Sequence, residues 1–512
     1  MGQSPQKNLS KKLAIFLLAI FSLPLLFSVC SHKPPEQPGE HILAQIGNKS
    51  ISVNEFIRRA EYTIRPPYCR MDNYIQKKIV LNSLVAEKLL ALEAGEDNPL
   101  TQNEEFQDYI EGRKEQAMRE WFFAHDFYDK VKPDTARARR VYQVAGRTYK
   151  IAYFSVKGPQ AAQMVQKKLN QGIPFEEIYR QFGGLKALPM RKVSWQEPEN
   201  EAIEKALFSG PLQKEEVIGP VSADNNFFTT IKILGWTDHA AMSNQQMRER
   251  WDSVVKRLRE EEAKHAYLGF VAKLMHGKRV EFDRNTFMAL ARIYQPIYLK
   301  SEKKKKQEFN EIFWKHKSPE DLSSDSIATQ ISQILNSPLL RLNGKTWTVA
   351  RFLKEERIHP LVFRKKKISG KEFPNQLKLA IVDLIQDKFV AKAAEKKGYD
   401  KVNVVQRNVA MWKDHLLFMY QRNKFLKSIG KKKGFYKNYS TILKNDLNPY
   451  IRRLQKKYSD TIRIDTDAFE KIKLTRIDMV ALQKNVPFPI IVPSFPIVTT
   501  LNKLDYGRKM NP

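Results

Sequence analysis

Side chains suited to catalysis are few in this sequence and stand apart from one another. Its nine histidines occur singly, its two cysteines are Cys30 and Cys69, and no His, Cys or carboxylate cluster has metal-ligand spacing. Neither Gly-x-Ser-x-Gly nor Cys-x-x-Cys occurs. The "NGKT" at 343–346 is not a phosphate-binding loop, because Leu339 stands where such a loop needs glycine. Hydrolase and redox chemistry are unsupported, and we expect no metal and no cofactor.

Cys30 has a context that points to lipid attachment. Three lysines at positions 7–12 precede the apolar run Leu13–Val29, a pattern typical of a secretion signal. The "LLFSVC" before the mature protein is similar to a bacterial lipobox, although Val29 replaces the usual Gly, Ala or Ser. An uncleaved membrane anchor is the alternative. Both predict a protein of the bacterial cell envelope, held in the periplasm at the outer membrane or, alternatively, the inner membrane.

The charge balance is strongly basic. The chain has 88 Lys+Arg against 56 Asp+Glu, a formal net charge of +32. An exported protein meets little nucleic acid, so we expect no nucleic-acid partner. The positive charge would favour binding to anionic lipid surfaces or to acidic polypeptides. Alternatively, it reflects an ordinary solvated surface in a lysine-rich proteome.

Two distant stretches share one pattern. "IGNKSISVNEFIRR" from Ile46 and "LNGKTWTVARFLKE" from Leu342 each predict a hairpin with a Gly-Asn or Asn-Gly turn, then a helix. A dense apolar helix, a long helix, and a closing helix with a short strand follow in both. The offset between the copies falls from 296 at Phe56 to 182 at Asp283, so the first copy carries about 110 extra residues. We expect two related lobes, with exchange of closing strands as the likeliest way for that expectation to fail.

The extra residues begin near Arg147 and predict a strand followed by a helix. Period-two alternation over 151–156 indicates a half-buried strand, and Ala161–Leu169 has helical spacing until Gly172 and Pro174.

This order of elements resembles the SurA-like periplasmic chaperones and their parvulin-type (PpiC-like) peptidyl-prolyl isomerase relatives. "ILAQIGNKSISVNEFIRR" with "LVAEKLLALEAGE" is similar to that family's N-terminal segment, and "YKIAYFSV" with "AAQMVQKKLNQGIPFEEI" to a parvulin domain. The resemblance implies an α+β, predominantly helical fold with two SurA-N-like repeats, the first interrupted by a parvulin-like α/β module.

The segments expected on this basis are a signal peptide at 1–30, a tether at 31–41, the first part of repeat 1 at 42–145, a degenerate parvulin-like domain at 146–238, the closing helix and strand of repeat 1 at 239–298, a polar connector at 299–338, repeat 2 at 339–475 and a Pro-rich tail at 476–512. The tail is predicted to be extended, and to pack as an edge strand or to occupy the client groove.

The resemblance also locates an isomerase pocket, and there the sequence departs from it. The two histidines of parvulins fall on Tyr153 and Thr229. The degenerate pocket candidates are Tyr153, Trp195, Phe208, Phe228 and Thr229. Loss of both histidines predicts weak or absent catalysis, although an active isomerase remains an alternative because the reaction needs no nucleophile. These aromatic residues would otherwise simply fill the core.

Two aromatic stripes are candidates for client binding: Trp121, Phe122 and Phe123 on one long helix, and Trp412, Leu416 and Met419 on the other. Such surfaces adapt to varied sequences, although stripes of this kind are more often core. The expected function is a lipid-anchored chaperone whose partners are unfolded or nascent envelope proteins. A structural assembly lipoprotein with one fixed partner is a further alternative.

Overall fold

The computed structural model describes residues 41–299, 325–475, 479 and 490–510, apart from 185–186, 198, 224–225 and 366–367. The apolar run Leu13–Val29, Cys30, the tether up to residue 40 and much of the connector lie outside these residues. Within them the chain is α+β and mainly helical, as the sequence predicts. No helix in the described ranges is long and apolar enough to cross a membrane.

Two β-hairpins begin the two similar stretches: β1 (Ile42–Ile46) with β2 (Lys49–Ser52), and β8 (Pro338–Leu342) with β9 (Lys345–Thr348). The first turns at Gly47 with φ +57°, and the second at Asn343 and Gly344 with φ +50° and +79°. Glycine and asparagine tolerate this left-handed backbone better than other residues. The predicted turns are confirmed, and they fix where each hairpin reverses.

Each hairpin is followed by a capped helix and then by a long buried one. The helices are α2 (Val53–Glu61) and α3 (Tyr74–Ala94) in the first stretch, and α13 (Val349–Ile358) and α14 (Phe373–Lys396) in the second. The Ser52 hydroxyl accepts a hydrogen bond from Glu55 N at 3.0 Å, and Thr348 caps α13 in the same way. α3 and α14 bury residues on most of their faces, so each needs covering by further elements.

The covering elements are exchanged between the two stretches. β10 (Ile462–Ile464) pairs antiparallel with β1, and β7 (Val280–Phe282) pairs antiparallel with β8. The long helices exchange as well: α15 (Asn403–Ser428) packs on α3, whereas α4 (Glu104–Phe123) packs on α13 and α14. The expectation of separately closed lobes is therefore wrong. The physical reason is that each long helix buries its apolar side chains against the other stretch.

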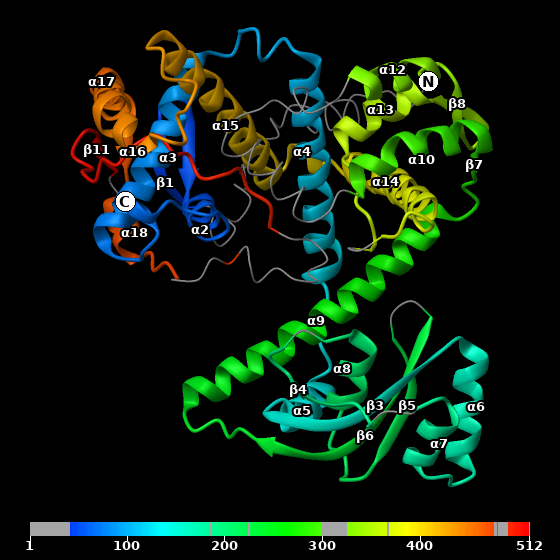
Figure 1. Ribbon diagram of the computed structural model, residues 1–512. Helices are drawn as coiled ribbons and strands as arrows, with labels where there is room; N and C mark the ends of the chain where they lie inside the picture. The colour runs from blue at the N-terminus through cyan, green and yellow to red at the C-terminus, as the bar shows by residue number, and fades with distance from the viewer. Residues whose placement is uncertain are drawn as a thin grey trace, which may run out of the picture.

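We call the two resulting bodies lobe A and lobe B. Lobe A contains β1, β2, α2, α3, α15, α16 (Tyr439–Ile442), α17 (Asn448–Lys457), β10, α18 (Thr466–Lys471) and the tail residues 490–510 with β11 (Arg508–Lys509). Lobe B contains β7, α10 (Arg284–Tyr298), α12 (Asp325–Ile334), β8, β9, α13 and α14. In Figure 1 α4 stands between the two lobes. The chain thus crosses between the lobes more than once.

Residues 147–238 form a separate α/β module. Its strands are β3 (Arg147–Lys157), β4 (Met190–Ser194), β5 (Val217–Ser222) and β6 (Phe227–Asp238), in the order β4-β3-β6-β5. Its helices are α6 (Pro159–Asn170), α7 (Phe175–Gln181) and α8 (Glu201–Phe208). The predicted strand and helix correspond to β3 and α6. Figure 1 shows the module below the lobes, with α9 (Asn244–Met275) running from it to lobe B.

Both faces of the module's sheet are covered. Ala152, Phe154 and Val156 pack against α6 and α7 on one face. Tyr149 and Ile151 face a second core built with α8, with α9 and with α5 (Thr135–Val144). Because α5 and α9 lie outside the sheet segment, they fix the module to the rest of the chain.

Candidate functional site

Tyr153 and Thr229, the two positions of the expected histidines, lie on the same face of adjacent strands. The register places Thr229 opposite Ser155 and Tyr153 opposite Ile231, so they are diagonal neighbours and not a facing pair. Thr229 is buried and shares a 2.8 Å hydroxyl hydrogen bond with Ser155. The ring of Tyr153 lies 5.1 Å from the Arg191 guanidinium. The Thr229 hydroxyl is therefore already paired, and neither contact supplies the acid or base that a histidine would offer near neutral pH.

Trp195 and Phe208 belong to the core of that face. They are 4% and 2% exposed, with ring centroids 5.5 Å apart. Trp195 Nε1 donates to Ser253 Oγ of α9 at 3.1 Å, and the Arg257 guanidinium lies 3.9 Å from its ring. Helix α9 therefore covers these two residues, and they are not walls of an open pocket.

Phe228 lies on the opposite face of the sheet, with the α6 and α7 core. The five pocket candidates thus fall on two faces: Phe228 lies on one, and the other four lie on the other, where Tyr153 packs against the core that contains Trp195 and Phe208. Strand alternation is the reason, because neighbouring residues Phe228 and Thr229 must point to opposite sides. The structure does not bring the five together as one site.

The two stripes predicted to bind clients are largely packed inside the protein. Phe122 and Trp412 are 1% and 7% exposed. Trp121 and Phe123 pack beside Phe122 at the junction of α4, α9 and α14, and Met419 packs against the lobe A core. Leu416 is partly buried. These residues therefore pack as core residues, and they do not line an open groove.

A charged cluster that the sequence reading missed lies inside lobe A. Arg59 of α2 donates two 2.7 Å hydrogen bonds to the two carboxylate oxygens of Glu87 on α3, and both side chains are fully buried. His415 of α15 contacts the same carboxylate through Nδ1 at 2.8 Å. Burial alone would raise the pKa of Glu87, but Arg59 and His415 outweigh it and hold that pKa far below the usual range.

A second group of ion pairs is centred on Lys88, the residue that follows Glu87 on α3. Lys88 Nζ lies 2.9 Å from Glu55 of α2 and 3.0 Å from Asp414 of α15. Lys49 reaches Asp414 at 2.6 Å. Burial lowers the pKa of Lys88, but the two carboxylates prevail and raise it above its ordinary value. These pairs connect the first stretch to α15 of the second and so specify the exchanged arrangement.

Lobe B carries a similar group at the corresponding helices. Lys388 of α14 contacts Glu115 of α4 at 3.2 Å and also pairs with Glu355 of α13. One residue before it, Asp387 contacts His359 at 2.7 Å and Arg119 of α4 at 3.5 Å. In both lobes a lysine and an acid on the buried helix therefore bind charges on the long helix of the other stretch.

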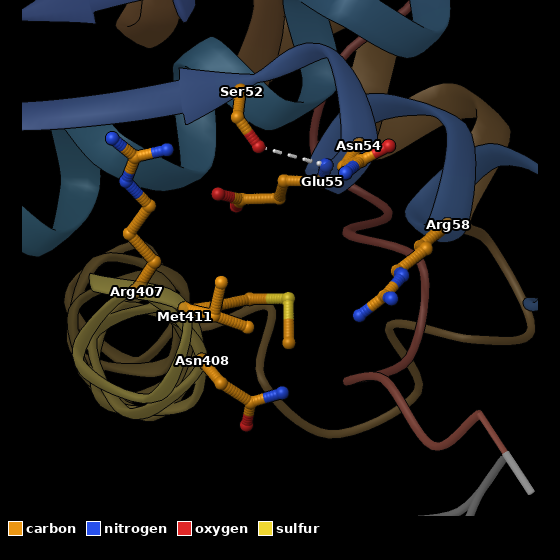
Figure 2. Close-up of a pocket in the computed structure, with 8 residues that line it drawn as sticks. Ser52, Asn54, Glu55, Arg58, Arg407, Asn408 and Met411 are labelled. Carbon is orange, nitrogen blue, oxygen red and sulfur yellow. Dashed lines mark hydrogen bonds between the residues drawn. The ribbon is translucent and has the colours of Figure 1, made fainter. Parts of the chain in front are cut away.

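A small pocket opens beside the charged cluster of lobe A. It encloses about 80 Å³ between α2 and the start of α15. Figure 2 shows Glu55 and Met411 facing each other in it, with Arg58 and Arg407 on either side. Burial raises the pKa of Glu55 despite Lys88. The pocket is too small for a polypeptide side chain larger than a few atoms, and it gives no chemistry of its own.

The tail is bound across lobe A. Phe495 and Val498 are 5% and 0% exposed and belong to the lobe A core. Arg59 Nη2 donates to Ser494 O at 3.0 Å, and the Ser494 hydroxyl contacts His415 Nε2 at 3.2 Å. The charged cluster therefore also binds the tail at Ser494, where the tail forms neither a helix nor a strand. Residues 490–507 form neither helix nor strand, so the edge strand predicted for the Pro-rich stretch is not seen in its described part; β11, which lies beyond that stretch, pairs with β10.

A scan against protein-family models finds no match, and a search of curated proteins finds none either.

The sequence did contain a signal for the missed cluster. The stretch "LNSLVAEKLLALEAGE" is apolar on most faces, yet it includes Asn82, Glu87 and Lys88. Polar groups inside a helix with no solvent-facing side must find buried partners. Their presence predicts a buried network, although the partners on α15 are more than 300 residues away and could not be identified from spacing.

We expect His415 to make the stability of lobe A depend on pH near neutrality. Burial lowers the pKa of His415, and Glu87 opposes that shift only in part. A group whose folded-state pKa lies below its unfolded value of about 6.5 stabilises the fold above that pH and loses this contribution as the pH falls. Urea unfolding between about pH 7.5 and pH 5.5 should show this decline, and His415→Gln should flatten it.

The matched control is His276→Gln, because His276 is exposed. This variant should keep the slope of the original protein. An unchanged slope in His415→Gln would contradict the assignment.

Proposed function

We propose that this protein is an exported chaperone that holds extended apolar segments of unfolded envelope proteins, resembling the SurA-like chaperones, with a parvulin-like module that binds and does not catalyse efficiently. In this proposal the two similar stretches are repeats, residues 147–238 are the inserted module, and Cys30 carries the lipid anchor. Cys30→Ser should then release the protein from membranes.

One observation carries the proposal: lobe A binds an extended apolar segment through that segment's backbone. Arg59, Arg422 and Asn82 are buried and donate hydrogen bonds to carbonyl oxygens of residues 494–503. Recognition through the backbone does not depend on the side chains of the bound segment. A chaperone with many clients needs this kind of recognition.

The contacts of the module favour binding over catalysis. Tyr153 and Thr229 replace the two histidines, and Thr229 is already bonded to Ser155. Met164 and Met190 on the module surface are 53% and 61% exposed. Methionine is flexible and polarizable, so it suits contacts with varied apolar chains.

An aggregation assay tests the function. An unfolded outer-membrane protein, diluted from urea and followed by light scattering, should stay soluble when an equimolar amount of this protein is present. Absence of suppression at several-fold excess would refute the proposal. Stoichiometric pull-down of one folded envelope protein, with no effect on aggregation, would favour the assembly lipoprotein instead.

A deletion variant tests the part played by the module. His239 N donates to Gly146 O at 2.9 Å, so a short Gly/Ser bridge can replace residues 147–238. The substitutions Val254→Thr and Leu258→Gln are added, because deletion of the module would otherwise expose these two apolar side chains of α9 to solvent. Most of the suppression should remain, since lobe A is unchanged. Complete loss of suppression in a folded variant would assign client binding to the module.

A further inference from the structure

Residues 490–510 are held in lobe A by burial of their apolar side chains and by hydrogen bonds from lobe A side chains, and for most of their length they pair with no strand. Pro493 and Pro496 are buried, as are Phe495 and Val498. Only at the far end does the segment join a sheet, where Arg508–Lys509 pairs parallel with β10. The segment before β11 has no helix or strand of its own. It therefore lies in lobe A as an extended peptide would.

The contacts to this segment are directed at its main chain. Arg59 donates to Ser494 O at 3.0 Å and Arg422 to Ile497 O at 3.3 Å. Asn82 Nδ2 donates to Leu501 O at 2.8 Å and to Lys503 O at 3.0 Å. All three donors are at most 1% exposed. Buried donors cost free energy when they lack acceptors, so the site requires an occupant that offers carbonyl groups.

Asn448 adds a further contact in the middle of the segment. Its Oδ1 accepts a hydrogen bond from Thr500 N at 3.0 Å and one from Thr499 Oγ1 at 2.8 Å. The Asn448 amide also donates to Thr500 Oγ1 at 2.8 Å. Lobe A thus pairs with both carbonyl and N–H groups of the bound main chain, as sites for extended peptides do.

The composition of the segment suits a ligand of this kind. Proline fixes φ and lacks an N–H, so an extended chain with two prolines loses little entropy on binding and leaves fewer donors unsatisfied. Phe495 and Val498 provide the buried apolar contacts. The site therefore fits an extended, apolar, proline-containing polypeptide.

The two halves of the segment are packed differently. The first half, around Phe495 and Val498, is buried. The second half borders two open pockets of about 500 and 330 Å³, beside α17 and beside Tyr74 and Glu470. Asn502, Lys503 and Asp505 in this half are exposed. Release can therefore begin in this second half, without first opening the core around Phe495 and Val498.

Lobe B lacks the counterpart of Asn82, one of the polar residues that hold the tail. Lys88 and Lys388 occupy matching sites on α3 and α14, and six residues before them stand Asn82 and Val382. The valine cannot donate to a peptide carbonyl. Lobe B therefore offers no counterpart of the Asn82 hydrogen bonds to Leu501 and Lys503.

We propose that this surface of lobe A is a peptide-binding site for extended, apolar, proline-containing segments of unfolded polypeptides, and that residues 490–510 are its resident, exchangeable occupant. The inference rests on the proposed chaperone function and names the site and the class of ligand. The tail covers the buried donors when no client is bound. A tethered tail has a high effective concentration at the site, in the mM range for a short linker. A client segment replaces the tail when the local concentration of that client segment reaches a similar value.

The test uses the full chain with a protease recognition sequence replacing part of residues 480–486. After cleavage the tail remains as a separate chain, and its exchange can be followed. A fluorescent peptide with the sequence of residues 490–510 is added, and its anisotropy is measured before and after cleavage. We expect the cleaved protein to bind this peptide at least about tenfold more tightly than the uncleaved protein, because the tethered competitor is gone.

Asn82→Val tests the main-chain contacts. It removes both hydrogen bonds to Leu501 and Lys503 and should weaken peptide binding by about tenfold to hundredfold. Asn54→Val is the matched control, because Asn54 is an exposed residue of the same lobe that makes no hydrogen bond to the described residues 490–510. Thermal unfolding of both variants shows whether lobe A remains folded.

The outcomes separate this inference from the function on which it rests. Competition between the labelled peptide and an unfolded client supports both. If the unfolded client does not compete with the labelled peptide, although the protein still prevents aggregation, the chaperone function stands and the assignment of this binding site is refuted. If the tail never exchanges, or if its release unfolds lobe A, residues 490–510 are a fixed part of the core and the inference is overturned.

Discussion

Replacing Glu87 with leucine is expected to lower the free energy of unfolding by about 3–5 kcal/mol. Arg59 and Glu87 are fully buried and joined by two hydrogen bonds of 2.7 Å. Removing the carboxylate leaves the guanidinium buried without its main counter-charge, and no solvent can replace it. Urea unfolding at neutral pH, followed by circular dichroism, measures the loss.

Two further variants make this result specific. Arg59→Met combined with Glu87→Leu should recover part of the loss, because neither charge is then left unpaired. Glu104→Gln should change the stability little, because its partner Lys354 and the carboxylate itself are exposed. A loss below about 1 kcal/mol in Glu87→Leu would show that the buried pair does not hold lobe A together.

Residues 339–475 expressed alone should fail to fold into a stable unit. In this fragment β10 lacks its partner β1, and α15 lacks α3, with which Phe418 and Leu426 form one core. Co-expressed fragments 42–298 and 325–512 should instead form a one-to-one complex, since together they contain both exchanged halves. Size-exclusion chromatography and circular dichroism distinguish these states.

A control fragment sharpens the comparison. Residues 42–298 expressed without a partner should also be poorly folded in the lobes, because β7 lacks β8. Cooperative, concentration-independent unfolding of residues 339–475 alone would contradict the exchanged arrangement. It would support the lobes that the sequence predicted.

Local patterns in the sequence were sufficient to predict the elements. The hairpin turns at Gly47 and at Asn343–Gly344 require positive φ, and their residue types indicate this directly. Alternation over 151–156 predicts β3, and helical spacing predicts α6, because both depend only on neighbouring residues.

The exchange of closing strands could not be predicted in this way. β7 and β10 are each three residues long, and their sequences are compatible with either hairpin. The choice between them is made by the buried faces of α4 and α15 and by ion pairs such as Lys88 with Asp414, which are distant in sequence. Spacing within the chain contains no information about such pairs.

The candidate site was harder still to predict. Trp195, Phe208 and Phe228 are aromatic residues in a small module, but only the structure shows that α9 covers the first two and that Phe228 faces the other way. The tail-binding residues Arg59, Asn82 and Arg422 come from two separate stretches. Each looks like an ordinary helix residue until the fold places all three along one extended segment.

Refolding of a client whose slow step is prolyl isomerisation tests the central claim, binding without efficient catalysis, most directly. In the presence of this protein the soluble yield of the client should rise with the protein-to-client ratio, while the rate constant of its slow phase stays unchanged. A slow phase accelerated many-fold, with no gain in yield and with the acceleration lost in Tyr153→Ala, would contradict the account and show an active isomerase.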